Sequence, residues 1–210
     1  MIREFNPDYL AYGIEVNMLA ASNPEAFNKY RSLTEKVYRI LKKENPNLPI
    51  FLTFYIRHFH QFNQTEPVRQ LLPFTDYMAV SCYPFLEGYN SPKMLPPDWF
   101  SRLAQFAPEK PFAIAETGYT AENVVIKGMG VDFPGSEEQQ ASYARFILEE
   151  LHKLNGKFVV WFFGRDYVTD IDFAKLWQYS GMIDRNGKSR EALRIWDEWL
   201  KLPYKGDLKH

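Results

Sequence analysis

The sequence contains one cysteine, Cys82, among its 210 residues. A single cysteine excludes an internal disulfide, and the chain has no Cys-x-x-Cys pair for zinc or redox chemistry. No apolar run approaches the roughly 20 residues that a membrane span requires, and the first residues lack the apolar stretch of a secretory signal. These absences leave the compartment open.

An excess of charge of either sign is also missing. The chain carries 25 Lys and Arg against 26 Asp and Glu, a formal net charge of −1. Such a balance provides no bulk electrostatic attraction for nucleic acid or an anionic membrane. Neither Gly-x-Gly-x-x-Gly nor Gly-x-x-x-x-Gly-Lys occurs, which argues against nucleotide binding. We therefore expect neither a nucleic-acid nor a membrane partner.

Aromatic residues, by contrast, are abundant. They make up 17% of the chain, as 17 Phe, 13 Tyr and 5 Trp. Aromatic side chains fill a hydrophobic core or line a cleft for flat apolar faces, such as those of sugars. A chain of this length buries a core without crosslinks, so composition alone does not choose between these uses.

Short apolar segments alternate with longer segments of helical period, a pattern typical of βα units on a parallel sheet. Strands are expected at 9–17, 49–56, 76–83, 111–116 and 157–163. Helices are expected at 24–44, 97–106, 136–155 and 189–200, the first with Asn23 as its cap and the third with a Ser136 and Gln139 capping box. Long loops are expected at 57–66, 84–96 and 117–135, after strands, where parallel α/β folds place their functional residues.

The spacing of these units restricts the architecture. Each unit occupies roughly 39 residues, so a closed eight-stranded barrel would need about 310 residues. The chain is therefore either an open doubly wound sheet or the last five units of a (β/α)8 barrel. Residues 1–5 read as the tail of a helix that feeds a strand, which favours the barrel. We expect one domain over residues 1–210, an incomplete α/β barrel.

Two glutamates fall where a parallel sheet presents its functional edge. Alternation along 11–17 places Glu15 and Asn17 on the interior side, and Glu116 ends the strand at 111–116. An interior carboxylate is costly unless it is paired or hydrogen-bonded. Two converging carboxylates suit glycosidic bond cleavage, in which one protonates the leaving oxygen while the other attacks. The alternative is that each glutamate is the structural ion-pair partner of an Arg or Lys.

Short segments in the same order resemble glycoside hydrolase clan A, which includes cellulases, β-mannanases and endo-β-1,4-galactanases. GIEVN at 13–17 and AETGY at 115–119 are similar to its strand-four and strand-seven signatures. SCYP at 81–84 and VWFF at 160–163 are similar to strands six and eight. The segment GMIDRNGK at 181–188, followed by a Trp-rich helix, is also typical of the clan. The resemblance covers strands four to eight.

The resemblance implies a retaining glycosidase that needs no metal or organic cofactor. The resemblance assigns Glu15 as the acid/base and Glu116 as the nucleophile. It also implies that Tyr83 hydrogen-bonds the nucleophile and that Trp161 forms the floor of a sugar subsite. Asn17 shares the side of Glu15 and is a further candidate for binding a carbohydrate substrate. The residues themselves leave Tyr83 and Trp161 open as ordinary core aromatics.

The sequence departs from the clan in two ways. Clan members usually carry Asn immediately before the acid/base Glu, where this chain has Ile14, and strands one to three are missing. An open barrel exposes the edges of its first and last strands unless a second copy or a complementing chain covers them. A remnant that binds carbohydrate without cutting it is therefore an alternative function. His58 and His60 lack a nearby third ligand, so no metal site is expected.

Overall fold

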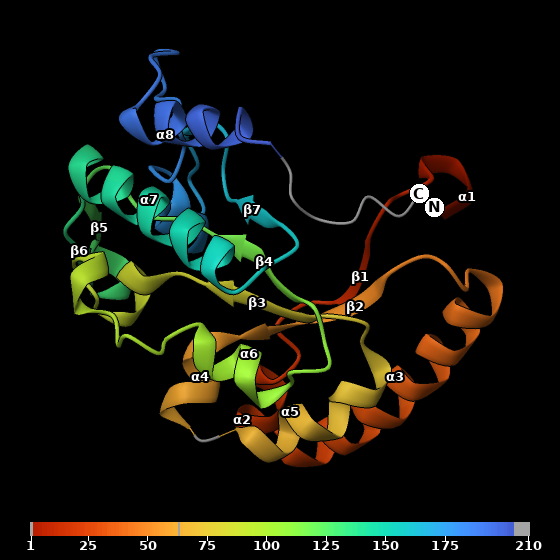
Figure 1. Ribbon diagram of the computed structural model, residues 1–210. Coiled ribbons are helices and arrows are strands. Elements are labelled where there is room, and N and C mark those ends of the chain that lie inside the picture. The colour runs from red at the N-terminus through yellow and green to blue at the C-terminus, as the bar shows by residue number, and fades with distance from the viewer. Residues whose placement is uncertain (1, 63, 204–210) are drawn as a thin grey trace. The chain divides into compact units, whose positions relative to one another are not determined.

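The computed structural model describes residues 2–62 and 64–203 (Figure 1). The chain divides into two compact units. Unit 1 comprises the residues up to Cys82 together with Phe100–Ala115, and unit 2 comprises Tyr83–Trp99 and the residues from Glu116 onward. Within the described ranges, no helix is long and apolar enough to cross a membrane. The single domain over residues 1–210 stays a prediction.

The main sheet has five strands, whose order in space follows their order in the chain. They are β1 (Leu10–Gly13), β2 (Ile50–Tyr55), β3 (Met78–Cys82), β4 (Phe112–Thr117) and β7 (Val159–Trp161), hydrogen-bonded in the order β1-β2-β3-β4-β7. β1 runs parallel to β2 with Leu10 opposite Ile50, and β2 runs parallel to β3 with Thr53 opposite Ala79. A doubly wound sheet contains a point where the strand order reverses, so this order excludes that alternative. It confirms an incomplete (β/α)8-type sheet.

Unit 1 places helices around β1 to β3. They are α1 (Ile2–Phe5), α2 (Met18–Ser22), α3 (Pro24–Glu44), α4 (Ile56–Gln61), α5 (Thr65–Leu71), the 3-10 turn η1 (Leu72–Phe74) and α6 (Ser101–Phe106). α3 has its predicted bounds because the Asn23 side chain accepts a hydrogen bond from Ala26 N at 2.9 Å and Pro24 begins the first turn. The loop expected at 57–66 was wrong in part, since α4 continues directly from β2 and a hydrogen bond from Arg57 to Gln61 spans one of its turns.

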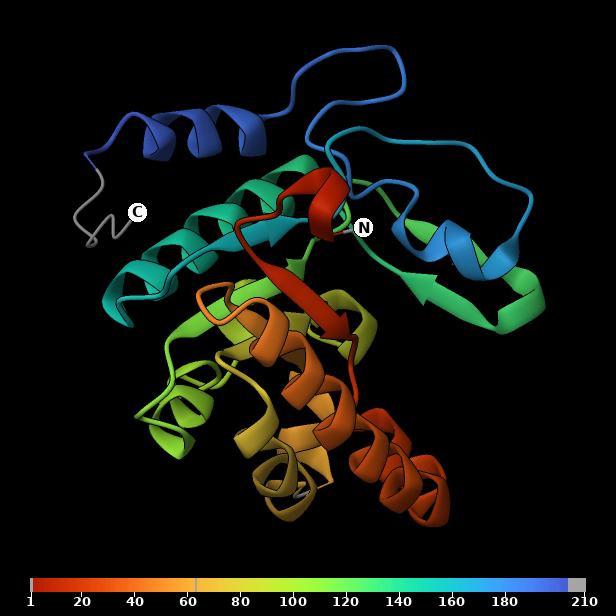
Figure 2. The ribbon, with the colours of Figure 1, turned by 90° about the vertical axis from the view of Figure 1, so that its right-hand side faces the viewer.

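Unit 2 packs two long helices beside β7. Its elements are η2 (Pro84–Glu87), η3 (Pro92–Met94), β5 (Val124–Ile126), η4 (Lys127–Met129), β6 (Val131–Phe133), α7 (Glu137–Lys153), η5 (Asp172–Trp177) and α8 (Glu191–Leu200). Ser136 caps α7 by accepting a hydrogen bond from Gln139 N at 3.2 Å. Ala141 and Leu148 of α7 pack against Ile195 of α8, with Val159 of β7 beside them. Figure 2 shows the ribbons of the two helices. The segment expected as a long loop at 117–135 contains the antiparallel hairpin of β5 and β6.

β1 is shorter than predicted, because the chain turns after Gly13. Glu15 has a φ of 49°, and its N–H donates to Thr53 Oγ1 at 2.8 Å. The next N–H, that of Val16, donates to the Thr53 carbonyl oxygen at 3.1 Å. The alternation predicted for 11–17 therefore fails beyond Gly13, since Val16 and Asn17 are both buried. Glu15 lies on a turn that follows the carboxyl end of β1.

Asp76 ties β2 to α3 in unit 1. Its carboxylate accepts hydrogen bonds from Tyr38 Oη at 2.5 Å, Lys42 Nζ at 3.0 Å and Ile50 N at 2.8 Å. Burial by itself would raise the pKa of Asp76, but these three donors outweigh it and hold the pKa below its ordinary value. A lowered folded-state pKa stabilises the fold above the unfolded pKa of about 3.9, and this stabilisation is lost as the pH falls through the folded-state pKa.

We expect Asp76→Asn to lower the free energy of unfolding at pH 7 by about 1 to 3 kcal/mol, because one charged acceptor of several hydrogen bonds is lost. The difference from the parent should shrink as the pH falls from about 4 through the lowered folded-state pKa of Asp76, because the parent carboxylate then becomes protonated as well. Urea unfolding at pH 7 and in acid measures both effects. A constant difference across this range would contradict the assigned role of the charge.

Candidate active site

Glu116 and Tyr83, predicted as a pair, meet in unit 2. Glu116 lies near the carboxyl end of β4 and is partly buried, and Tyr83 directly follows β3 with 2% of its surface exposed. The Tyr83 hydroxyl donates a short hydrogen bond to Glu116 Oε1. Among the residues that the structure describes, no Lys or Arg forms an ion pair with Glu116 within 4.0 Å. The site therefore holds a carboxylate oriented by a buried phenol.

Phe162 lies on the same side of unit 2 as this pair. Its N–H donates to Thr117 O at 2.7 Å, and its ring is edge-on to Tyr83 with centroids 6.3 Å apart. Gly118 permits this close approach of the two strand ends, because a Cβ there would lie 2.5 Å from the Phe162 carbonyl oxygen. An apolar ring thus lies beside the tyrosine that orients the carboxylate.

The side chain of Trp161, predicted to form the floor of a sugar subsite, packs against helices α7 and α8. Its ring contacts Tyr143 of α7 and Trp196 of α8, each with centroids 6.0 Å away, and its indole N–H donates to Ser180 O at 2.8 Å. Successive side chains of a strand point to opposite sides, so Trp161 and Phe162 cannot both face Tyr83. These contacts are those of a core aromatic. The role of Trp161 in sugar binding stays a prediction, and these contacts do not favour it.

Two further aromatic residues were missed by the sequence analysis. The Trp177 ring of η5 lies 5.7 Å from Tyr83 and 6.3 Å from Phe162 between centroids. Phe173 contacts Trp177 at 5.2 Å and is 63% exposed. Together these rings lead from the carboxylate to the protein surface. No strand or helix period marks the segment after β7, so the sequence contained no signal for them.

Unit 1 contains the other two predicted site residues. Glu15 is partly buried on the turn after β1, where Thr53 fixes its backbone. Asn17 is fully buried, and its Nδ2 donates to Tyr55 O at 3.0 Å and Gln64 Oε1 at 3.1 Å. Its Oδ1 accepts from Tyr55 N at 2.7 Å. Asn17 thus ties the turn that carries Glu15 to the end of β2, and its contact with a sugar stays a prediction.

The two histidines lie on α4 and belong to different surroundings. Burial, assisted by the charge of Arg57, lowers the pKa of His58. His60 Nδ1 lies 3.4 Å from Arg102 Nη1. No three His, Cys, Asp or Glu side chains of residues 2–62 and 64–203 gather into a group that would hold a metal ion.

A buried arginine joins the segments that follow β4 and β7. The Arg190 side chain is 1% exposed and pairs with Asp166 at 2.9 Å and with Glu122 at 2.8 Å. Its Nη1 also donates to the carbonyl oxygens of Tyr179 and Gly181, each at 3.1 Å. This network fixes three segments of unit 2 to the residue that precedes α8.

Comparison with known proteins shows the fold of TIM-barrel glycosidases. No family model and no curated protein matches the sequence. Among solved structures, an endo-laminarinase from Formosa Hel1_33_131 matches with a TM-score of 0.68 and 17% identity, covering 94% of this chain and 60% of that one. A Rhizomucor miehei β-1,3-glucanosyltransferase in complex with laminaritriose matches with a TM-score of 0.62 and 14% identity, covering 91% and 66%. A Faecalibacterium prausnitzii β-glucuronidase matches with a TM-score of 0.54 and 17% identity, covering 88% and 30%.

Proposed function

We propose that the chain carries the catalytic residues of a retaining β-glycosidase, with Glu116 as nucleophile and Glu15 as acid/base. The observation that carries this proposal is the hydrogen bond from the buried Tyr83 hydroxyl to Glu116 at the carboxyl end of β4. The fold shared with TIM-barrel glycosidases supports it.

The proposed reaction has two displacements. Glu116 attacks the anomeric carbon, the bond to the glycosidic oxygen breaks, and Glu15 gives its proton to the departing oxygen. Glu15, now a carboxylate, takes a proton from water, which attacks the same carbon and releases Glu116 from the glycosyl ester. Two inversions at one carbon retain its configuration. This mechanism requires the two carboxyl groups to lie about 5 to 5.5 Å apart.

The neighbouring residues have separate tasks in this proposal. Tyr83 holds the Glu116 carboxylate in one orientation, which favours attack from a fixed position. Phe162 presents an apolar ring to the C–H face of the sugar. Thr53 and Asn17 fix the backbone that carries Glu15. No step calls for a cofactor.

We propose β-1,3-linked glucan oligosaccharides as the substrate class. Two structures that cover more than 90% of this chain are named as a laminarinase and as a β-1,3-glucanosyltransferase. The β-glucuronidases match a smaller share of the chain, so aryl β-glucuronides are the second class to examine.

Product analysis tests this function. Laminari-, cello- and manno-oligosaccharides and aryl β-glycosides are incubated with the chain, and the anomer released first is identified by NMR. We expect the β anomer, and Tyr83→Phe should lower kcat about 10 to 100-fold because one charged hydrogen bond is lost. Tyr119→Phe is the matched control, since its hydroxyl donates to the carbonyl oxygen of Tyr89. Release of the α anomer, or equal rates for the two variants, would overturn the proposal.

A non-catalytic carbohydrate-binding remnant is the second candidate. It is favoured by Ile14, which is 59% exposed and stands where the clan usually has Asn. Sugar-dependent thermal stabilisation without turnover would support this candidate.

We also infer that a complementing chain or a second copy covers the outer edges of β1 and β7, the end strands of the sheet. Light scattering tests this, and an active monomer of 24.8 kDa would exclude it.

A further inference from the structure

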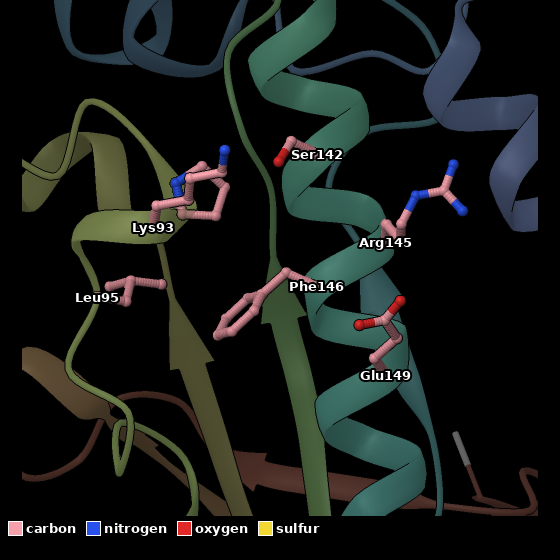
Figure 3. A pocket seen from close by; sticks show the side chains of 7 residues that line it. Lys93, Leu95, Ser142, Arg145, Phe146 and Glu149 are labelled. Carbon is pink, nitrogen blue, oxygen red and sulfur yellow. The ribbon is translucent and has the colours of Figure 1, made fainter.

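We propose that unit 2 has a second carbohydrate site on the outer face of α7, where it binds a neutral glycan without cleaving it. A hollow of about 310 Å³ lies between α7 and the segment around η3 (Figure 3). A second hollow of about 420 Å³ shares Pro92, Lys93 and Ser142 with it, so the two form one groove. Its lining includes none of Glu116, Tyr83 and Phe162, so the groove is distinct from the candidate active site.

The floor of the groove is apolar. Phe146 extends from α7 toward Leu95 on the opposite wall, as Figure 3 shows. Pro92 and Leu95 are themselves buried, so the floor is part of the packed structure. An aromatic ring within an apolar floor offers a surface for the C–H face of a pyranose.

The rim of the groove carries charges of both signs. Lys93 and Arg145 contribute two positive charges, and Glu138 and Glu149 contribute two negative charges. The formal sum is zero, which provides no net attraction for phosphate, a nucleic acid or an acidic polymer. Donors and acceptors on the same rim suit a ligand rich in hydroxyl groups, each of which both donates and accepts. The chemistry therefore favours a neutral glycan.

The wall opposite α7 is held in place before any ligand arrives. Gln139 Nε2 of α7 donates to Asn90 O at 2.5 Å, and the buried Tyr119 hydroxyl donates to Tyr89 O at 2.9 Å. Ser91 Oγ accepts from Lys93 N at 3.3 Å at the start of η3. A preformed wall reduces the ordering cost of binding. Each hollow also lies within the range of about 300 to 1,000 Å³ that is common for small-ligand sites.

Binding is measured by titration calorimetry with laminarihexaose, cellohexaose and mannohexaose. The parent is Glu116→Gln, which keeps these ligands intact if the chain is catalytic. Ser142→Trp is the main variant, because Ser142 is exposed and lies in both hollows, so a large side chain there fills the groove without disturbing the core. Phe146→Ala removes the aromatic ring from the floor of the groove. Lys153→Ala is the control, a change of an exposed residue in the last turn of the same helix.

We expect at least one of the hexasaccharides to lose one binding site per chain in Ser142→Trp, and to bind Phe146→Ala about tenfold more weakly, the change that about 1.4 kcal/mol produces. Lys153→Ala should bind as the parent does. With Glu116 restored, Ser142→Trp should leave the hydrolysis of aryl glycosides unchanged, which separates this site from the catalytic proposal. Parent stoichiometry and affinity in both groove variants would overturn the inference, as would displacement of the sugar by inorganic phosphate.

Discussion

Glu116→Gln is expected to lower the kcat of glycoside hydrolysis by about four orders of magnitude, the scale of loss when a covalent nucleophile is removed. The amide keeps the volume and the contact with Tyr83 but cannot form the glycosyl ester. The rate on an aryl β-glycoside or a laminari-oligosaccharide measures the loss. Glu198→Gln, a change at an exposed position of α8, is the matched control and should retain the parent rate.

Azide distinguishes the two proposed carboxylates. In Glu116→Ala the small anion enters where the carboxylate stood and attacks the anomeric carbon directly, so one inversion gives the α-glycosyl azide. In Glu15→Gln the glycosyl ester still forms on Glu116, and azide attacks it to give the β-glycosyl azide. The same anomer from both variants, or full activity of Glu116→Gln, would contradict the assigned roles.

Features that depend on residues close to one another in the sequence could be predicted. The bounds of α3 follow from Asn23 and Pro24 at its start, and the start of α7 follows from Ser136. The strand order was predictable once the helix tail at residues 1–5 favoured the barrel over the doubly wound sheet, because βα units that succeed one another in the chain lie beside one another in a barrel. The end of β1 was not predictable in this way, since the turn at Glu15 depends on hydrogen bonds to Thr53, 38 positions away.

The residues of the candidate site were likewise predictable only in part. Glu116 was found because it ends a predicted strand, and Tyr83 was found because SCYP at 81–84 resembles a strand end of the clan. Trp161 was chosen through the resemblance of VWFF to strand eight of the clan, but the ring next to Tyr83 is that of Phe162, and Trp161 contacts Tyr143 instead. Trp177 contacts Tyr83 through a segment without periodicity, so only the structure places it there.

The stability of unit 2 is expected to depend on Arg190 more than on any exposed charge. Arg190→Ala leaves Asp166, whose side chain has no exposed surface, without its ionic partner. A carboxylate stranded in this way costs about 3 to 5 kcal/mol, which is a large share of the stability of a domain. We therefore expect the free energy of unfolding in urea to fall by that amount, with the segments after β4 and β7 exchanging amide protons faster.

Arg194→Ala provides the comparison on the same helix. Arg194 pairs with Glu191 and Glu198 but is 56% exposed, so its removal should cost no more than about 1 kcal/mol. The double variant Arg190→Met with Asp166→Leu should recover most of the loss, because it removes the stranded charge along with its partner. If the double variant is as unstable as Arg190→Ala, the hydrogen bonds to Tyr179 and Gly181 carry the effect instead of the ion pair. A cost below 1 kcal/mol for Arg190→Ala would show that water reaches Asp166 once the guanidinium is gone.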